Sequence, residues 1–268
     1  MIRNRIAAAG TLLLAGTTLA ACAATGTESV TEKTTAAQSP APTVSETLLD
    51  AVPDESSPAF HYTVKGGVSP FSGVIDPAGK ALTAEIAQKV PDTPITLSMK
   101  FLVIEEKIWT KIAFKGATAD MGLPKLPKKW MSLDPAKTED SFVTEMKYSE
   151  AEVDPGSVAA LVSAADDLKE TTPGHYAGTT DLTKSTEAEI VEGATLTALG
   201  EKAKGVPLEV VVDGEGRIST ATVKIPAAGK TKASTYKVTY DQYGSAASLE
   251  VPADAVKATA DVYDLLKG

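Results

Sequence analysis

The sequence is poor in the residues that most often carry chemistry. It has one cysteine and two histidines in 268 residues, and aromatic side chains make up only 5% of the chain. A single cysteine excludes an internal disulfide and a multi-cysteine zinc site. The Gly-x-Ser-x-Gly and His-Glu-x-x-His motifs and the dinucleotide-binding glycine pattern are also missing. We therefore expect a non-catalytic protein without a metal or a cofactor.

The single cysteine, Cys22, follows a segment that is typical of a bacterial lipoprotein signal. Two arginines precede an uncharged apolar run over residues 6–19, which is too short to span a bilayer comfortably. The run ends in the sequence LAAC at residues 19–22, which resembles the lipobox at which a diacylglyceryl group is attached to the cysteine. We predict a signal peptide over residues 1–21 and a lipid anchor on Cys22 at the extracytoplasmic face of the cell membrane. The alternative is a buried free cysteine.

Residues 22–45 are expected to tether a folded domain to this anchor. After the cysteine the stretch is rich in Thr, Ser, Ala and Pro, and it has almost no large apolar residue with which to bury a core. Residues 46–268 contain no second linker and no internal repeat, which favours a single domain. The net charge of −9 argues against a nucleic-acid partner and against electrostatic binding to anionic lipid.

Short segments in which apolar and polar residues alternate dominate the predicted domain. They are AFHYTVKGG, KALTAEIAQ, ITLSMKFLVI and KIWTKIAF in the first half, and PLEVVVD, RISTATVKI, STYKVTYDQY and AASLEVP in the second. This alternation predicts half-buried strands. The turn signals DPAG at residues 76–79 and DGEG at residues 213–216 predict tight reversals between antiparallel strands.

Four helices are expected to interrupt this pattern. The clearest begins at Asp154-Pro155 and places five apolar side chains on one face, namely Val158, Leu161, Val162, Ala165 and Leu168. The others are expected over residues 46–52, 197–204 and 253–266. The order of strands and helices predicts an α+β fold, with the helices packed on one face of a curved antiparallel sheet.

Two patterns that resemble catalytic or metal sites are better explained as structure. Ser234 and Lys237 match the Ser-x-x-Lys of penicillin-binding enzymes, but they lie in a predicted strand, which places them on opposite faces. Asp213 and Glu215 suggest a calcium site, but Arg217 follows at the next alternating position and opposes a cation there.

The order of these features resembles the LppX/LprAFG-type lipoproteins of actinobacteria. The resemblance covers about residues 46–258 and rests on the order of several signatures, including HYTVKGGV, FSGVIDPAGK, KKWMSLDP, GHYAGTTDLT and VPLEVVVDGEGRIS. It implies a curved, half-open antiparallel β-barrel, similar to the LolA/LolB carriers, with helices covering its concave face. It also implies a hydrophobic cavity that binds an acylated lipid or glycolipid and carries it across the cell envelope. The Pro- and Lys-rich loop GLPKLPKKW, residues 122–130, departs from the family pattern.

One hairpin is expected to form a wall of such a cavity. If Glu105 and Glu106 make a two-residue turn, the flanking strands place seven apolar side chains on one face, interrupted by Thr110: Leu97, Met99, Phe101, Val103, Ile108, Ile112 and Phe114. The opposite face, with several lysines and Trp109, is expected to see solvent. Glu-Glu is an unusual two-residue turn, and a slip of one residue would reverse the faces of the second strand. The alternative function is a tethered, non-catalytic binding or scaffold module with a filled core.

Overall fold

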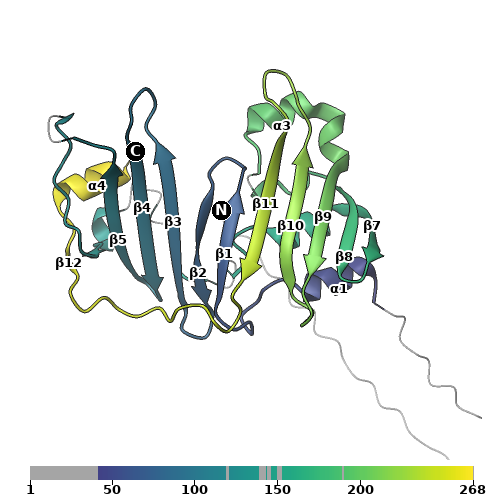
Figure 1. The fold of residues 1–268 in the computed structure, drawn as a ribbon, viewed down its shortest axis with the longest axis horizontal. Helices are drawn as coiled ribbons and strands as arrows, with labels where there is room; N and C mark the ends of the chain where they lie inside the picture. Colours follow the sequence, from purple (N-terminus) through teal and green to yellow (C-terminus); the bar gives the residue numbers. More distant parts are fainter. Residues whose placement is uncertain are drawn as a thin grey trace, which may run out of the picture. The chain divides into compact units, whose positions relative to one another are not determined.

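The computed structural model describes residues 42–118, 121–138, 143, 146–149, 153–188 and 190–267. Ala41–Gly268 form one compact unit. Cys22, the predicted signal peptide and most of the predicted tether lie outside the described residues. The described part is α+β, with one large open sheet and a few short helices (Figure 1). None of its helices has the length and apolar content needed to cross a bilayer.

The sheet has twelve strands in the order β12-β6-β5-β4-β3-β2-β1-β11-β10-β9-β8-β7. Every neighbouring pair is antiparallel except β12 and β6. The strands are β1 Phe60–Lys65, β2 Phe71–Asp76, β3 Ala81–Lys89, β4 Thr96–Ile104, β5 Lys107–Lys115, β6 Met131–Ser132, β7 Ala165–Thr172, β8 His175–Thr180, β9 Val206–Val212, β10 Ile218–Ile225, β11 Ser234–Asp241 and β12 Val256–Lys257.

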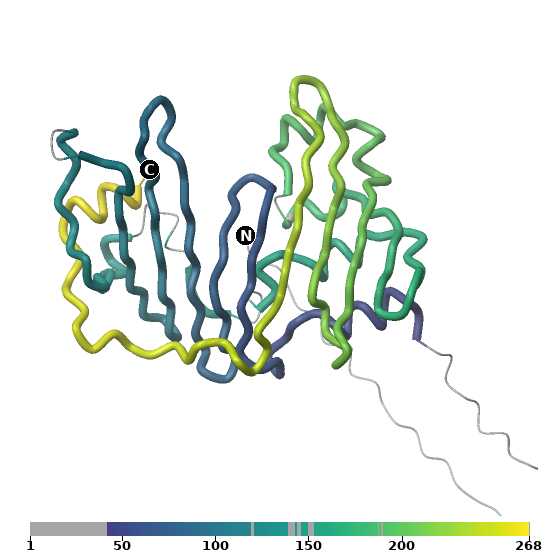
Figure 2. Tube along the Cα trace, viewed as in Figure 1, coloured from purple at the N-terminus to yellow at the C-terminus, as the bar shows by residue number. Residues whose placement is uncertain are grey.

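The connection from β11 to β12 spans most of the sheet. Five strands, β1 to β5, lie between β11 and β6, the strand with which β12 pairs. Figure 2 shows residues 242–255 passing along the ends of these strands to reach the far side. The last helix is therefore delivered to the β4–β6 side of the sheet.

The helices are short, and the first one has a clear start signal. They are α1 Val44–Asp50, α2 Val158–Ser163, α3 Gly193–Leu199 and α4 Ala260–Leu266, with 3-10 turns at Pro135–Lys137, Thr186–Ala188 and Gly200–Gly205. Thr43 and Glu46 form a capping box, in which each side chain accepts a hydrogen bond from the other residue's backbone N–H, at 3.2 and 2.7 Å. Because of this cap, α1 begins two residues before the predicted start of the domain at residue 46.

The helix predicted after Asp154 is confirmed over Val158–Ser163 and is wrong beyond that range. The Asp154 carboxylate does accept a hydrogen bond from a helix N–H, that of Ala159 at 2.8 Å, but α2 has only six residues. Ala165 and Leu168, which were expected on its apolar face, lie in β7, where the backbone pairs with β8 instead. The apolar spacing over residues 158–168 is compatible with one continuous helix and also with a short helix followed by a strand. Leu168 is buried in both arrangements.

Two other helices also begin away from their predicted positions. The helix expected over 253–266 starts at Ala260, because residues 256 and 257 first pair with β6. The helix expected over 197–204 is split into α3 and a 3-10 turn that meet at Gly200.

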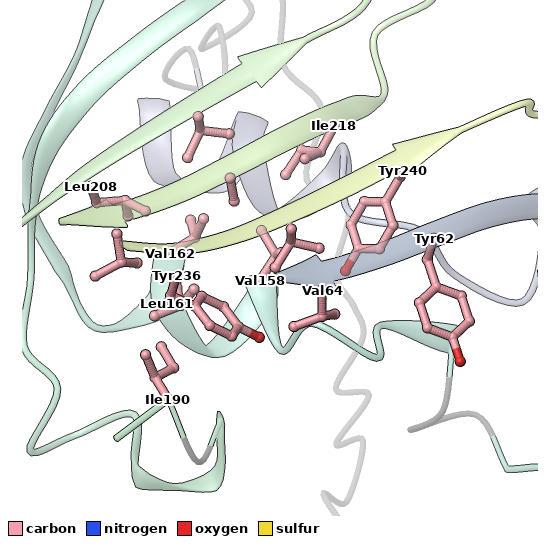
Figure 3. Packing of buried hydrophobic residues seen from close by; sticks show 14 of the residues in the cluster. Tyr62, Val64, Val158, Leu161, Val162, Ile190, Leu208, Ile218, Tyr236 and Tyr240 are labelled. Atoms are coloured by element: carbon pink, nitrogen blue, oxygen red, sulfur yellow. The ribbon is translucent and has the colours of Figure 1, made fainter. Parts of the chain in front are cut away.

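Both hydrophobic cores of the described residues lie on one face of the sheet. Residues paired directly across adjacent strands share a face, and one such row runs from β4 to β9: Met99, Ile86, Phe71, Val64, Val238, Ala221 and Val210. The larger core, which we call the tyrosine core, gathers around β1 and β9–β11 with α1 and α2 (Figure 3). The smaller, which we call the hairpin core, consists of Met99, Phe101, Ile112, Met131, Val143, Val262 and Leu266.

A close crossing at Gly73 lies between these cores. Tyr62 pairs with Gly73 of β2, and its hydroxyl donates to the carbonyl of Thr83 in β3 at 2.9 Å. A Cβ atom on Gly73 would lie 1.8 Å from that carbonyl oxygen, which no side chain can tolerate. Glycine is therefore required for the tyrosine to reach across β2.

Candidate functional site on the β4–β5 hairpin

The predicted hairpin and its register are confirmed. Val103 lies opposite Ile108, and the pairing continues in step to Leu97 opposite Phe114. Glu105 occupies the turn with a positive φ of 55°, and its N–H donates to the Lys80 carbonyl at 2.8 Å. This hydrogen bond to the neighbouring hairpin helps to hold glutamate in a conformation that usually requires Gly or Asn.

The middle of the predicted wall faces other side chains. Phe101 and Val103 are fully buried, and Met99 and Ile112 are 7% and 5% exposed. Met99, Phe101 and Ile112 belong to the hairpin core, where side chains of α4 and β6 cover them, whereas Val103 belongs to the tyrosine core. The three remaining wall residues are half-buried: Leu97, Ile108 and Phe114.

Two pockets lie where the wall is not covered. The turn-end pocket, of about 240 Å³, is lined by Ile108, Leu133 and Val143 with Glu106 and Lys147 among its polar residues. The loop pocket, of about 530 Å³, is lined by wall residues Ile112 and Phe114 and by the segments 117–118 and 123–128. Its volume lies within the range of about 300–1,000 Å³ that is usual for small-molecule sites.

The loop pocket exists because β6 is short. β6 pairs with β5 only at Trp109 and Thr110, so residues 111–115 have no strand partner on that side among the described residues. The Pro- and Lys-rich loop, noted above as a departure from the family pattern, lies over this edge. It contributes Leu123 and Leu126 to the apolar lining.

The surroundings of the loop pocket are basic in an acidic protein. Residues 107–137 contain seven lysines against two aspartates, a net charge of +5, whereas the whole chain carries −9. Lys111 and Lys128 line the pocket, and neither forms an ion pair with another described residue. Lys111 Nζ lies 4.7 Å from the centre of the Trp130 ring, a cation–π contact that leaves its charge uncompensated.

Thr110 is the one polar residue in the apolar wall. It is fully buried, and its hydroxyl oxygen has no hydrogen-bond partner among the described residues. Its cross-strand neighbours are Phe101 and Met131, both in the hairpin core. A buried hydroxyl without a partner is costly, and it marks a place where the protein alone does not satisfy its own polar groups.

The expectation for the opposite face of the hairpin is partly wrong. Lys107 is exposed and Lys100 and Lys111 are partly exposed, as predicted, but Trp109 is only 6% exposed. Trp109 lies directly opposite Leu102, which is 3% exposed. The sequence signal was the uninterrupted apolar run FLVI in β4, which is typical of a strand covered on both faces.

The other candidate residues have structural roles. Ser234 and Lys237 are exposed on opposite faces of β11. Arg217 donates to the Asp213 carboxylate from Nε and Nη2, at 3.0 and 2.9 Å, and the N–H of Glu215 donates to it as well. Burial alone would raise the pKa of Asp213, but these hydrogen bonds prevail and lower it. Within the described ranges, no three His, Cys, Asp or Glu residues are grouped so that they could hold a metal ion.

A further pocket lies beside the tyrosine core. The tip pocket, of about 430 Å³, is lined by Val68 at the end of the β1–β2 hairpin and by residues of the segment 182–196, including Leu182, Ile190 and Leu196. Val68 is 51% exposed. This pocket is the main competitor of the loop pocket as a ligand site.

No model of a known protein family matches the chain, and no curated protein matches it.

Proposed function

We propose that this protein is a membrane-tethered, extracytoplasmic lipoprotein that binds an acylated lipid or glycolipid in the loop pocket. Cys22 carries the lipid anchor, and residues 23–45 hold the domain away from the membrane. The domain acts as a carrier or binder without catalytic activity, as in the LppX/LprAFG-type lipoproteins that the sequence resembles. The observation that carries the proposal is the loop pocket, which extends the apolar wall of the hairpin and is lined by two lysines that form no ion pair with a described residue.

The lining of the loop pocket has the polarity of an amphiphile. Ile112, Phe114 and Leu126 offer an apolar surface for a hydrocarbon chain. Lys111 and Lys128 offer positive charge beside it, which favours a headgroup that bears a phosphate or a carboxylate. The net charge of +5 over residues 107–137 favours an anionic ligand although the whole chain is acidic.

The sheet supports a half-open barrel as the form of the carrier. It is one open layer of twelve strands, and both cores lie on the same face, as a strongly curved sheet with a concave apolar side requires. In this proposal the helices cover the concave face, and the loop pocket is the place where the cover is incomplete.

The experiment that tests the proposal is mass spectrometry of organic extracts from the purified protein. The chain carries Cys22→Ser, so that no acyl group of the anchor is counted. We expect about one acylated lipid per protein, and we expect its loss in Phe114→Asp, which places a charge on the floor of the loop pocket. Val251→Asp is the matched control, because Val251 is 57% exposed and does not line that pocket.

One observation favours a second candidate, a tethered binding or scaffold module with a filled core. The middle of the wall, around Met99, Phe101 and Ile112, is packed against α4 and β6. An extract without lipid from a protein that melts cooperatively would support this module and overturn the carrier.

A further inference from the structure

We infer that α4 is a displaceable cover and that the acyl chain takes its place on the hairpin core. The binding track then runs from the loop pocket, across the surface that α4 now covers, to the turn-end pocket. The hydroxyl of Thr110 lies in the middle of this track and hydrogen-bonds a polar group of the ligand. This inference rests on the proposed function and names the place where the acyl chain of the ligand binds.

The two pockets lie along the same face of one strand. Ile112 lines the loop pocket and Ile108 lines the turn-end pocket, with Thr110 between them on β5. Four residues of a strand span about 13 Å, so the covered stretch between the pockets is short. A chain that enters one pocket reaches the other only across this stretch.

Side chains of α4 form part of the cover over this stretch. Val262 and Leu266 are buried in one cluster with Met99, Ile112, Met131 and Val143. Figure 1 shows α4 beside β5 and β12, at the end of the chain's path along the sheet. Two aliphatic side chains on this helix thus occupy the volume in which a hydrocarbon chain would make the same apolar contacts.

Apart from its buried side chains, few polar interactions among the described residues hold α4 in place. The helix has seven residues, and isolated helices shorter than about 12–15 residues are marginal in water. Its Tyr263 hydroxyl accepts a hydrogen bond from the Asp134 N–H at 2.9 Å, and Lys137 Nζ lies 5.5 Å from the Tyr263 ring centre.

Thr110 is the second, independent indication of a ligand. A packed core that had no other state would pair this hydroxyl or replace the residue with valine, which has the same shape. An acylated ligand on the track brings an ester carbonyl or a hydroxyl, and either group satisfies Thr110. The expected ligand is therefore an acyl chain with an oxygen function near the chain, rather than a plain hydrocarbon.

The test combines binding and hydrogen exchange on the full chain with Cys22→Ser. The probe is cis-parinaric acid, a fluorescent fatty acid. Leu266→Ala weakens the docking of α4, and we expect it to bind the probe roughly tenfold more tightly, because the competent state becomes more populated. Asp264→Ala is the matched control, since this residue lies exposed on the same helix, and its affinity should equal that of the parent.

Hydrogen exchange identifies the displaced element directly, without relying on a variant. Probe binding to the parent protein should reduce the protection of the α4 amides while it raises protection in β5. Thr110→Val should leave the melting temperature equal or higher, and it should bind the methyl ester of the probe more weakly than the parent does. Equal binding of that ester would remove Thr110 from the site.

The outcomes separate this inference from the proposed function. Probe binding with unchanged α4 protection and no effect of Leu266→Ala overturns the displaceable cover and leaves the lipid binder intact. No probe binding by any of these proteins overturns the proposed function, and the inference falls with it.

Discussion

The tyrosine core and the hairpin core share one sheet face but are closed in different ways. In the tyrosine core, buried polar groups have partners: the Tyr236 hydroxyl donates to the Gly156 carbonyl at 3.0 Å, the Tyr240 hydroxyl donates to Asp154, and the Thr180 hydroxyl donates to the Leu161 carbonyl at 2.8 Å. In the hairpin core, the hydroxyl of Thr110 has none among the described residues. The first core is complete in itself, and the second is not.

The elements that close the two cores differ as well. Leu48 of α1 and Leu161 of α2 are both fully buried in the tyrosine core. The hairpin core is covered by the seven-residue helix α4 together with Met131 and Val143, and it is flanked by pockets at both ends. Regions with fewer constraints open at lower free energy, and ligand sites are drawn from them. We therefore infer that the tyrosine core stabilises the fold, whereas the hairpin core is the more adaptable of the two.

A matched pair of leucine substitutions should give the largest difference in stability between the two cores. Leu208 and Leu266 are 0% and 1% exposed in the tyrosine core and the hairpin core. Leu208→Ala should lower the free energy of unfolding by about 2–5 kcal/mol, because a void opens in a core that cannot relax. Leu266→Ala should cost less than about 2 kcal/mol, because α4 can undock and limit the loss. Urea denaturation measures both, and equal losses would contradict the distinction.

A substitution at the crossing between the cores should have the next largest effect. Gly73→Ala places a methyl group 1.8 Å from the Thr83 carbonyl oxygen and 2.9 Å from the Tyr62 hydroxyl. We expect the free energy of unfolding to fall by about 1–3 kcal/mol because of overpacking, which a lower melting temperature would show. Gly214→Ala is the control, because nothing lies within 4 Å of the position of its Cβ. A Gly73→Ala protein as stable as this control would show that the crossing is not tight.

A smaller effect is expected on the tyrosine-core side as a dependence on pH. The pKa of Asp213 is lowered because hydrogen bonds from Arg217 and Glu215 outweigh the effect of burial. Its stabilisation is present above the unfolded pKa of about 3.8 and is lost as the pH falls through the lower folded pKa. Asp213→Asn should cost about 1 kcal/mol at pH 7 and progressively less in acid. A constant difference across the acid range would be inconsistent with this ion pair.

The sequence was sufficient to predict the hairpin but not what covers it. The alternation of apolar and polar residues over most of ITLSMKFLVI and KIWTKIAF assigns the faces of both strands, so the register and the shared face of the seven apolar residues could be derived. The cover could not, because Val262 and Leu266 lie more than 145 positions from Ile112 and no local pattern shows that they meet. The burial of Trp109 was not predicted, because the lysines around it indicate a solvated face and outweighed the signal of the apolar run FLVI.

The helical segments were the least predictable part of the fold. Val158, Leu161 and Val162 are spaced as on one helix face, and Leu168 continues that spacing although it lies in a strand. Pairing between β7 and β8 overrides the local pattern there, as the pairing of β12 with β6 does before α4. The loop pocket could be located only in part: its Pro- and Lys-rich loop stands out in the sequence, but the short β6 that leaves an edge uncovered does not.

Crosslinking a fatty acid to the protein tests most directly whether an acyl chain binds along β5 and in the loop pocket. A photoactivatable fatty acid with a diazirine in its chain is irradiated with the Cys22→Ser protein, and the labelled peptides are mapped by mass spectrometry. We expect labels in β5 and in residues 117–128, and few in the segment 182–196 that lines the tip pocket. Labels concentrated in the segment 182–196 and absent from β5 would contradict this expectation.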